Sequence, residues 1–490
     1  MCGFIGILGP RDSQVFPQLA TGLLAIQHRG QDAAGALTYD GRFHLHKSQG
    51  LVRDVFTPEA AESLTGWMGV AHVRYPTVGL GGAEDAQPFM IGYPFGVGMV
   101  HNGNVTNFDE IRNEMSAGSH WHVNSSCDLE GILNVFGDEL ARQKIETLQP
   151  KNIFDAVRGV FSRVKGAYSV VGIVADEGMY AFRDPYGIKP IIMGSRLDEQ
   201  GRKTWCVASE SVLMDILDFH ETVDLAAGEA VFIDKHGELH REQIGENTHT
   251  PCLFEWVYFA RPDSFLDKVS VYKTRLRLGE LMAPVWEATG WKADVIIPVP
   301  ESATTSAMAM ARALDMTYRE GLVKNRYIGR TFIMGSNDLR RDAIRMKLNP
   351  IQLEFDGKDV LLVDDSIVRG NTSRKIVEVA RRAGARKVYF ASVSPPLRYP
   401  CIYGIDMATK NEFVARDRSD EAIAQEIGAD GVVYLPLESL KQAVFEGNDA
   451  LTDSCNACFS GHYPTGDVDE ARLANIEAER IVAGAEQPPG

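Results

Sequence analysis

The first half of the chain alternates short apolar runs with two amphipathic stretches. Four runs, each bounded by glycine or proline, have the composition of strands: "CGFIGILG" (2–9), "GVAHVRY" (69–75), "GVGMVHNG" (96–103) and "AYSVVGIVA" (167–175). Residues 15–27 place Leu19, Leu23 and Ile26 on one helical face, and residues 129–140 form a second amphipathic helix. This mixed order predicts sheets covered by helices rather than a doubly wound domain.

The second half has a more regular order of strands and helices. Strands are expected at 294–300, 359–365 and 387–395, and helices at 274–286, 306–314 and 373–382. Such alternation predicts a parallel sheet that binds its ligands at the carboxyl ends of the strands. The polar stretch "REQIGENTHT" (241–250) separates the halves. We therefore expect domains at 2–250 and 251–466, followed by a charged tail at 467–490 that forms a fraying helix.

Composition narrows the class of protein. A chain of 490 residues, 44% hydrophobic and 24% charged, is typical of a soluble protein of two or three domains. The net charge of −16 argues against a surface for nucleic acid or an anionic membrane. No apolar run is long enough for a membrane span, and no basic region precedes the apolar start, so we expect a cytoplasmic protein without a signal peptide. Its seven cysteines are then candidates for chemistry or metal binding rather than for disulfides.

The stretch "VLLVDDSIVRGNTS" (360–373) has the features of a phosphate site. An apolar strand ends in Asp364 and Asp365, and a loop of small polar residues then leads directly into a helix. Backbone N–H groups of residues 366–372 at the start of that helix form a cradle for an anion. The two carboxylates can hold ribose hydroxyls or Mg²⁺. A simple helix cap needs only one such polar residue, and here five polar or glycine positions lie together.

This stretch resembles the phosphoribosyl pyrophosphate (PRPP) signature of type I phosphoribosyltransferases, and "VPES" (299–302) resembles their pyrophosphate loop. The resemblance implies Mg²⁺ held near Ser302, Asp364 and Asp365. It also implies a basic loop, "KNRYIGRTF" (324–332), that closes over the diphosphate and excludes water. The implied PRPP-binding residues are Asp364, Asp365, Ser366, Val368, Arg369, Gly370, Asn371 and Thr372, with Lys324, Arg326 and Arg330 from the basic loop.

Cys2 becomes the first residue if Met1 is removed, although position alone favours an ordinary buried cysteine. Five motifs change that balance: "CGFIGILG", "QHRGQDAAG" (27–35), "HVRYPTVG" (72–79), "HNGN" (101–104) and "CDLE" (127–130). Together they resemble the glutaminase domain of class II glutamine amidotransferases, which has the N-terminal-nucleophile αββα fold. A free α-amino group titrates at about 7.7–8.0, so Cys2 can use its own amine as the base for its thiol.

The resemblance also assigns roles to other residues of this half. Asn102 and Gly103 would form the oxyanion hole, Arg74 would hold the α-carboxylate of glutamine and Asp128 its α-ammonium. The chain departs from the usual Ser-Asp-Ser/Thr-Glu pattern of these enzymes, because it has Cys127 and Leu129 in "CDLE". Three histidines near these motifs are interpreted as structural: His28, His72 and His101.

The two halves together resemble the glutamine phosphoribosylpyrophosphate amidotransferase family over nearly the whole chain. The implied reaction converts glutamine, PRPP and water to 5-phosphoribosylamine, glutamate and pyrophosphate, at the start of purine synthesis. Ammonia would pass internally between the sites. Feedback inhibition by purine nucleotides and a homotetramer are implied by the resemblance alone. The main alternative, a regulator that senses PRPP, would carry a DNA-binding helix-turn-helix and a basic patch, and this sequence has neither.

Four further cysteines lie next to prolines or in a C-x-x-C pair: Cys252, Cys401, Cys455 and Cys458. By chemistry alone, four thiolates suit tetrahedral zinc and a [4Fe–4S] cluster about equally. One branch of the family has a [4Fe–4S] cluster with cysteines in these contexts, so the resemblance favours the cluster, with a structural role. The remaining Cys127 and Cys206 are interpreted as core residues.

Overall fold

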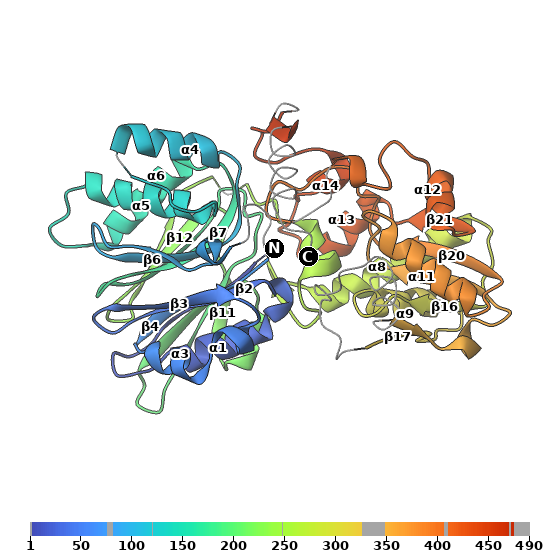
Figure 1. Ribbon diagram of the computed structural model, residues 1–490, viewed down its shortest axis with the longest axis horizontal. Coiled ribbons are helices and arrows are strands. Elements are labelled where there is room, and N and C mark those ends of the chain that lie inside the picture. The colour runs from blue at the N-terminus through green and yellow to red at the C-terminus, as the bar shows by residue number, and fades with distance from the viewer. Residues whose placement is uncertain are drawn as a thin grey trace.

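The computed structural model describes residues 2–75, 82–119, 121–246, 248–325, 348–405, 410–469 and 472–474. The first half of the chain, blue to green in Figure 1, lies beside the second half, yellow to red. Within the described residues, no helix combines the length and the apolar character needed to cross a bilayer.

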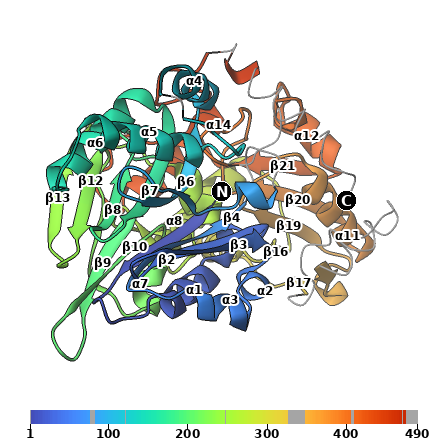
Figure 2. The ribbon, with the colours of Figure 1, turned by 60° about the vertical axis from the view of Figure 1, so that its left-hand side comes forward.

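Two antiparallel sheets lie face to face in the first half (Figure 2). The first contains, in spatial order, β11 (His220–Asp224), β9 (Ile192–Leu197), β10 (Lys203–Ala208), β1 (Gly3–Leu8), β4 (Met68–Arg74), β2 (Ala33–Tyr39) and β3 (Phe43–Gln49). The second contains β13 (Leu239–Gln243), β12 (Glu229–Asp234), β8 (Gly178–Arg183), β7 (Gly166–Val174), β6 (Val97–Val105) and β5 (Phe89–Ile91). Apolar side chains such as Phe4 and Val70 from one sheet and Val100 and Val171 from the other fill the space between them.

Helices cover the outer face of each sheet (Figures 1 and 2). One layer contains α1 (Phe16–Ala25), α2 (Val52–Val55), α3 (Pro58–Ser63) and α7 (Val212–Ile216), and the other contains α4 (Phe108–Glu114), α5 (Leu129–Arg142) and α6 (Pro150–Arg163). Each helix layer packs on its sheet through a separate buried cluster. The predicted αββα sandwich is confirmed. The helices predicted at 15–27 and 129–140 correspond to α1 and α5, whereas α6 and most strands outside the four predicted ones were missed.

A parallel sheet organises the second half, in the order β16 (Val295–Pro298), β19 (Asp359–Asp364), β20 (Lys387–Ser392) and β21 (Gly431–Tyr434). Its strands are buried on both faces, which is why they read as continuous apolar runs. Ile296 and Leu361 face α8 (Val271–Ala288) and α9 (Thr304–Ala313), whereas Val360 and Leu362 face α11 (Asn371–Arg382) and α12 (Asp420–Ile427). The predicted alternation of strands and helices is confirmed here.

The remaining elements of the second half are short. They are α13 (Leu437–Phe445), α14 (Ala457–Ser460) and the two-stranded pairs β14 (Phe265–Leu266) with β15 (Val269–Ser270) and β17 (Leu322–Lys324) with β18 (Leu348–Pro350). Of the tail predicted to form a fraying helix, residues 467–469 and 472–474 are described, and the rest lies outside the described residues.

A buried group of charged side chains lies where the two halves meet. Arg29 is ion-paired to Glu210 and donates a hydrogen bond from Nη2 to Glu255 Oε2 at 2.9 Å. Glu210 also accepts a hydrogen bond from Ser264 Oγ in the second half at 2.7 Å. Burial opposes ionisation of Glu210, but the charge of Arg29 outweighs it and holds the pKa of this carboxyl far below its usual value. This group therefore links the two halves of the chain. The buried charges of Arg29 and Glu210 stabilise the structure only while they remain paired.

Replacing Glu210 with Gln is expected to lower the free energy of unfolding by about 3 kcal/mol at neutral pH, because one buried partner of Arg29 is lost. Since folding lowers the pKa of Glu210, its carboxylate contributes to the free energy of unfolding at neutral pH. This contribution is lost as the pH falls below the pKa of about 4.3 in the unfolded chain toward the lower pKa in the folded protein. Denaturant unfolding at several pH values measures both effects. The matched control is Glu242→Gln, which removes a solvent-exposed pair with Arg158 and is expected to cost less than about 1 kcal/mol. Equal effects of the two variants would contradict the prediction.

Candidate active sites

Cys2 directly precedes β1, the middle strand of the first sheet. Its backbone nitrogen donates a hydrogen bond to Asn102 Oδ1 at 3.4 Å, and its thiol donates to the carbonyl of Tyr75 at 3.8 Å. A Cβ on the next residue, Gly3, would lie 3.1 Å from Cδ of Arg29, so a small residue lets the chain pass close to the ion-paired group. Cys2 is partly exposed while strand β1 behind it is buried. A thiol and the nitrogen of the same residue are thus both within reach of a substrate.

Asn102 and Gly103 lie near the end of β6, in the second sheet, beside Cys2. The Asn102 side chain is fully buried, and its Nδ2 has no hydrogen-bond partner among the described residues. A buried donor without a partner is costly unless a ligand satisfies it, and an oxyanion is a suitable ligand. Gly103 has φ +152°, and a Cβ there would overlap the carbonyl oxygen of Ala167 on β7, so only glycine fits. The two residues predicted to form an oxyanion hole therefore lie beside the predicted nucleophile.

Arg74 ends β4 at the same end of the sheet as Cys2, because Gly3 on β1 pairs with Val73. Its side chain is buried, and its Nη2 lies 3.6 Å from Oδ2 of Asp85. Asp85 was not singled out from the sequence, since nothing in its local pattern distinguishes it. This ion pair holds the guanidinium in place at the end of β4, near Cys2.

Asp128 lies just before α5 and is held by two donors. Its Oδ2 accepts hydrogen bonds from Val105 N at 2.7 Å and from His101 Nε2 at 3.3 Å. Burial opposes ionisation of Asp128, but the charge of His101 and these hydrogen bonds outweigh it, so the pKa of this carboxyl lies below its usual value. His101 is in turn held by Gln87 Nε2, 2.9 Å from its Nδ1. The arrangement keeps a carboxylate ionised, as binding of an ammonium group requires, and agrees with a supporting role for His101.

The other residues of interest in this half are structural. Burial raises the pKa of Cys127 to about 12, so its thiol stays neutral at physiological pH in the position where the family usually has serine. Cys206 is fully buried, and both cysteines are core residues as predicted. His72 Nε2 lies 3.1 Å from the carbonyl of His101, and His28 Nε2 lies 3.0 Å from Glu210. These contacts agree with the interpretation of the histidines as structural.

A second site lies at the carboxyl end of the parallel sheet. Strand β19 ends in Asp364, and because its Val363 pairs with Pro298 on β16, the turns after the two strands lie at the same edge. Ser302 Oγ, from the turn after β16, donates to Asp365 Oδ2. Burial raises the pKa of both Asp364 and Asp365, and the charge of Asp365 raises that of Asp364 further. Two buried carboxyl groups that repel each other are stabilised by a bound cation.

The loop after Asp365 leads into the N-terminus of α11. Ser366 Oγ donates to Asp365 Oδ1 at 2.6 Å, which fixes the start of the loop. Gly370 has φ +75°, and a Cβ there would lie 3.0 Å from Val414 Cγ2, so glycine allows the turn into a 12-residue helix. The predicted cradle residues Val368, Asn371 and Thr372 lie in this turn and in the first positions of α11.

Two of the basic residues predicted for this site, Lys324 and Arg369, are among the described residues. Lys324, at the end of β17, has its Nζ 4.0 Å from Oε2 of Glu301 in the turn after β16, so it lies beside the predicted pyrophosphate loop. Arg369 is ion-paired with Glu412, with Nε 3.2 Å from Oε1. Arg326 and Arg330 lie outside the described residues.

Arg275, on α8, is a buried arginine on which carboxylates from both regions act. It donates hydrogen bonds to the carbonyls of Trp256 at 3.0 Å and Ala260 at 2.8 Å. Burial lowers the pKa of Arg275, and the charges of Asp365 and Glu210 oppose that shift. One side chain is thus within electrostatic reach of the acidic loop and of the ion pair behind Cys2.

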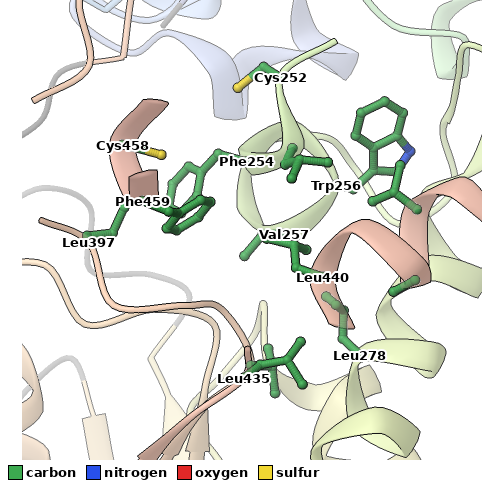
Figure 3. Close-up of a cluster of buried hydrophobic side chains, with 14 of the residues drawn as sticks. Cys252, Phe254, Trp256, Val257, Leu278, Leu397, Leu435, Leu440, Cys458 and Phe459 are labelled. Atoms are coloured by element: carbon green, nitrogen blue, oxygen red, sulfur yellow. The ribbon is translucent and has the colours of Figure 1, made fainter. Parts of the chain in front are cut away.

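The four cysteines singled out from the sequence come together. Cys252 and Cys455 form a parallel β-bridge, and the carbonyl of Cys458 accepts hydrogen bonds from the backbone of Arg398 and Tyr399, just before Cys401. All four are buried, and burial raises the pKa of Cys252 to about 12 and the pKa values of Cys455 and Cys458 well above the usual value. Figure 3 shows two of them, Cys252 and Cys458, bordering the apolar cluster around Phe254 and Phe459. Among the described residues, no three His, Cys, Asp or Glu side chains lie close enough to share a single metal ion.

A buried lysine faces this cluster. Lys189 is fully buried, and its Nζ makes no hydrogen bond to any described residue. Burial lowers the pKa of its ammonium, but negative charge on Cys252, Glu255, Cys401 and Cys455 outweighs this and raises it. An ammonium with three unused donors near three of these thiols, Cys252, Cys401 and Cys455, fits an anionic, sulfur-rich group at this position.

Two parts of the chain match known domain families. Residues 77–215 match the glutamine amidotransferase domain, and residues 272–396 match the phosphoribosyl transferase domain. The fold and the two sites thus define a glutamine amidotransferase joined to a phosphoribosyltransferase. Amidophosphoribosyltransferase of Pseudomonas aeruginosa is 47% identical over 98% of this chain and 96% of its own length, and that of Saccharomyces cerevisiae is 43% identical over 98% and 95%. The chain belongs to the amidophosphoribosyltransferase family.

Solved structures agree with this membership. Glutamine PRPP amidotransferase from B. subtilis, in complex with ADP and GMP, superposes with a TM-score of 0.84 at 33% identity, covering 96% of this chain and 98% of the other. A structure described as the allosteric regulatory enzyme of purine biosynthesis superposes with a TM-score of 0.85 at 33% identity, covering 97% and 99%.

Proposed function

We propose that this protein is a glutamine-dependent amidophosphoribosyltransferase that converts glutamine, PRPP and water to 5-phosphoribosylamine, glutamate and pyrophosphate, the first step of de novo purine synthesis. The main support for this proposal is the hydrogen bond from the Cys2 nitrogen to Asn102 Oδ1, which leaves the buried Asn102 Nδ2 available to a substrate. The same chain also contains the cradle that follows Asp364 and Asp365. Membership of the amidophosphoribosyltransferase family supports it.

Glutamine hydrolysis takes place at Cys2. The α-amine of Cys2 accepts the thiol proton as the sulfur attacks the side-chain amide carbon, and the oxyanion that forms is stabilised by Asn102 Nδ2 and the Gly103 N–H. The amine then passes its proton to the departing nitrogen, so ammonia leaves and a thioester remains. Water hydrolyses the thioester to glutamate and restores the thiol. Arg74 and Asp128 hold the α-carboxylate and α-ammonium of glutamine during these steps.

Ammonia then attacks C1 of the ribose of PRPP, and the C1–O bond to pyrophosphate breaks. The cradle at residues 366–372 binds the 5-phosphate, with Val368, Arg369, Gly370, Asn371 and Thr372 contributing backbone or side-chain contacts. Lys324, Arg326 and Arg330 neutralise the diphosphate. Asp364, Asp365 and Ser302 would hold Mg²⁺, which would supply positive charge to the diphosphate group. Internal passage of ammonia would avoid its protonation in bulk water.

We assign the two activities to separate halves of the chain. We assign residues 2–250 to the glutaminase domain, residues 251–466 to the phosphoribosyltransferase domain and residues 467–490 to a charged tail. We place the protein in the cytoplasm as a homotetramer that is inhibited by purine nucleotides and binds neither nucleic acid nor membrane. The complex of the B. subtilis relative with ADP and GMP supports nucleotide regulation.

We assign a [4Fe–4S] cluster to Cys252, Cys401, Cys455 and Cys458. Four thiolates around one zinc, each about 2.3 Å from the metal, must lie about 3.8 Å apart, whereas a four-iron cube needs wider spacing. The β-bridge between Cys252 and Cys455, and the hydrogen bonds from the backbone just before Cys401 to the carbonyl of Cys458, bring the four residues into one region, which supports a shared group. The unpartnered Lys189 ammonium and the Tyr403 N–H, which donates to Cys401 Sγ at 3.4 Å, suit a negatively charged cluster. Its role is structural, because neither half-reaction transfers an electron.

Protein purified without air is expected to be brown, to absorb broadly near 400 nm and to contain about four irons per chain. Cys458→Ser should lose most of this iron, because one ligand is removed. The matched control is Cys206→Ala, a buried cysteine outside the cluster, which should keep it. Iron analysis with absorption spectroscopy makes the measurement. Stoichiometric zinc, or an active protein free of metal, would refute the cluster and leave the enzyme assignment intact.

The function itself is tested by pyrophosphate release from PRPP, measured with glutamine and separately with ammonium. Release with either nitrogen source, together with equal amounts of glutamate in the glutamine reaction, is expected. Release with ammonium alone would reject the glutaminase half of the proposal, and no release with either source would reject it entirely.

A further inference from the structure

A segment of the second half packs directly against the oxyanion hole of the first. Gly404 has φ +95° and is buried, and a Cβ on it would lie 2.5 Å from the carbonyl oxygen of Gly103 and 2.7 Å from its carbonyl carbon. A Cβ on Gly103 itself would overlap Ala167 O on β7. Gly103 is therefore closely packed both by a strand of its own sheet and by a backbone segment of the other domain.

The same segment makes a hydrogen bond to the next residue of β6. Asn104 Nδ2 donates to the carbonyl of Ile402 at 2.8 Å, and both residues are buried. The segment is itself anchored, since Tyr403 OH lies 2.7 Å from Thr465 Oγ1 and Tyr403 N donates to Cys401 Sγ. A buried hydrogen bond and a backbone contact thus fix one rigid segment against the end of β6.

We propose that Gly404, with the segment 401–404 that carries it, is a positioning residue for the oxyanion hole. The inference rests on the proposed function and deepens it. An oxyanion donor acts only when it lies 2.7–3.1 Å from the oxygen that becomes charged. Gly404 contacts the Cα and carbonyl of Gly103, so a displacement of this residue also moves its N–H and weakens stabilisation of the transition state. The phosphoribosyltransferase domain therefore completes the glutaminase site, and ammonia release is efficient only when the two domains are docked.

The first test is Gly404→Ala. Its Cβ must displace Gly103, so kcat for glutamine hydrolysis is expected to fall about 10-fold to 10²-fold, while KM for glutamine changes by less than about twofold. Ammonia-dependent synthesis by the same preparation should stay near the wild-type rate, which shows that the chain is folded. The matched control is Gly357→Ala, which has the same kind of strain at φ +71° with no atom within 4 Å of the new Cβ, and which should leave both activities unchanged.

A second variant, Asn104→Ala, and a second reaction, alkylation of Cys2, distinguish the proposed effect from a general loss of folding. Asn104→Ala removes the hydrogen bond to Ile402 without adding an atom and should lower kcat in the same manner, by about 3-fold to 10-fold. Alkylation of Cys2 by iodoacetamide forms no oxyanion, so its rate should be unchanged in both variants. A parallel loss of alkylation and hydrolysis would overturn the proposal, because the defect would then lie in Cys2. Wild-type glutamine hydrolysis in both variants would also overturn it, but the proposed function would stand as long as Cys2→Ala is inactive with glutamine.

Discussion

Replacing Cys2 with alanine is expected to reduce glutamine-dependent synthesis of 5-phosphoribosylamine by more than about 10³-fold, because it removes the proposed nucleophile beside Asn102. Ammonia-dependent synthesis, assayed at high ammonium and high pH, should remain, since the PRPP cradle lies on the other domain. Pyrophosphate release with each nitrogen source measures both activities on one preparation.

Cys206→Ala serves as the control for Cys2→Ala, since it removes a buried thiol from the same sheet without reaching the site. It should keep glutamine-dependent activity. Mass spectrometry of the intact wild-type chain gives a second check, because the α-amine can act as a base only after Met1 is removed. An active protein that retains Met1, or equal loss of both activities in Cys2→Ala, would contradict the assignment of the nucleophile.

Replacing Asp365 with Asn is expected to lower PRPP turnover with either nitrogen source by about 10²-fold or more, since the loss of weaker supporting contacts at metal sites already costs up to that amount. Asp365 holds Ser302 and Ser366 as well, so its charge organises both turns of the cradle. Hydrolysis of glutamine to glutamate in the absence of PRPP should remain measurable. Initial rates of pyrophosphate and glutamate formation distinguish the two outcomes.

The matched control is Asp359→Asn, at the other end of strand β19, where the carboxylate pairs with Arg386 at 2.7 Å. This change removes one charge from the same strand and should leave PRPP turnover unchanged. Undiminished turnover in Asp365→Asn, or an equal loss in both variants, would contradict the placement of PRPP and Mg²⁺ at the carboxyl end of the sheet.

The hydrophobic pattern predicted those helices and strands whose buried side chains recur at a regular spacing. Strand β19 and helix α11 appear at the predicted places because the strand is apolar on both faces and the helix presents Ile376, Val377 and Ala380 to the core. Strand β3 was missed because it lies at the edge of its sheet and is only partly buried, so its pattern is mixed. Helix α6 had a usable signal, with Pro150 at its start and Ile153, Val157 and Val160 on one face.

The sequence by itself determined the chemistry of each half. The cysteine that follows Met1, and the adjacent aspartates before a loop and a helix, are local features whose function depends on a few neighbouring residues. Only the tertiary structure decided which residues support them. The hydrogen bonds of Asp128 with His101 and Val105 depend on how α5 packs on β6, and the ion pair of Arg29 with Glu210 depends on how the halves dock.

The same holds for the contact of Gly404 with Gly103 and for the meeting of four cysteines spread from residue 252 to 458. Such contacts join segments far apart in the chain, and they are set by the stacking of the sheets and the docking of the domains. No period or motif along the chain encodes them, because their energy comes from burial and pairing that exist only after the chain has folded.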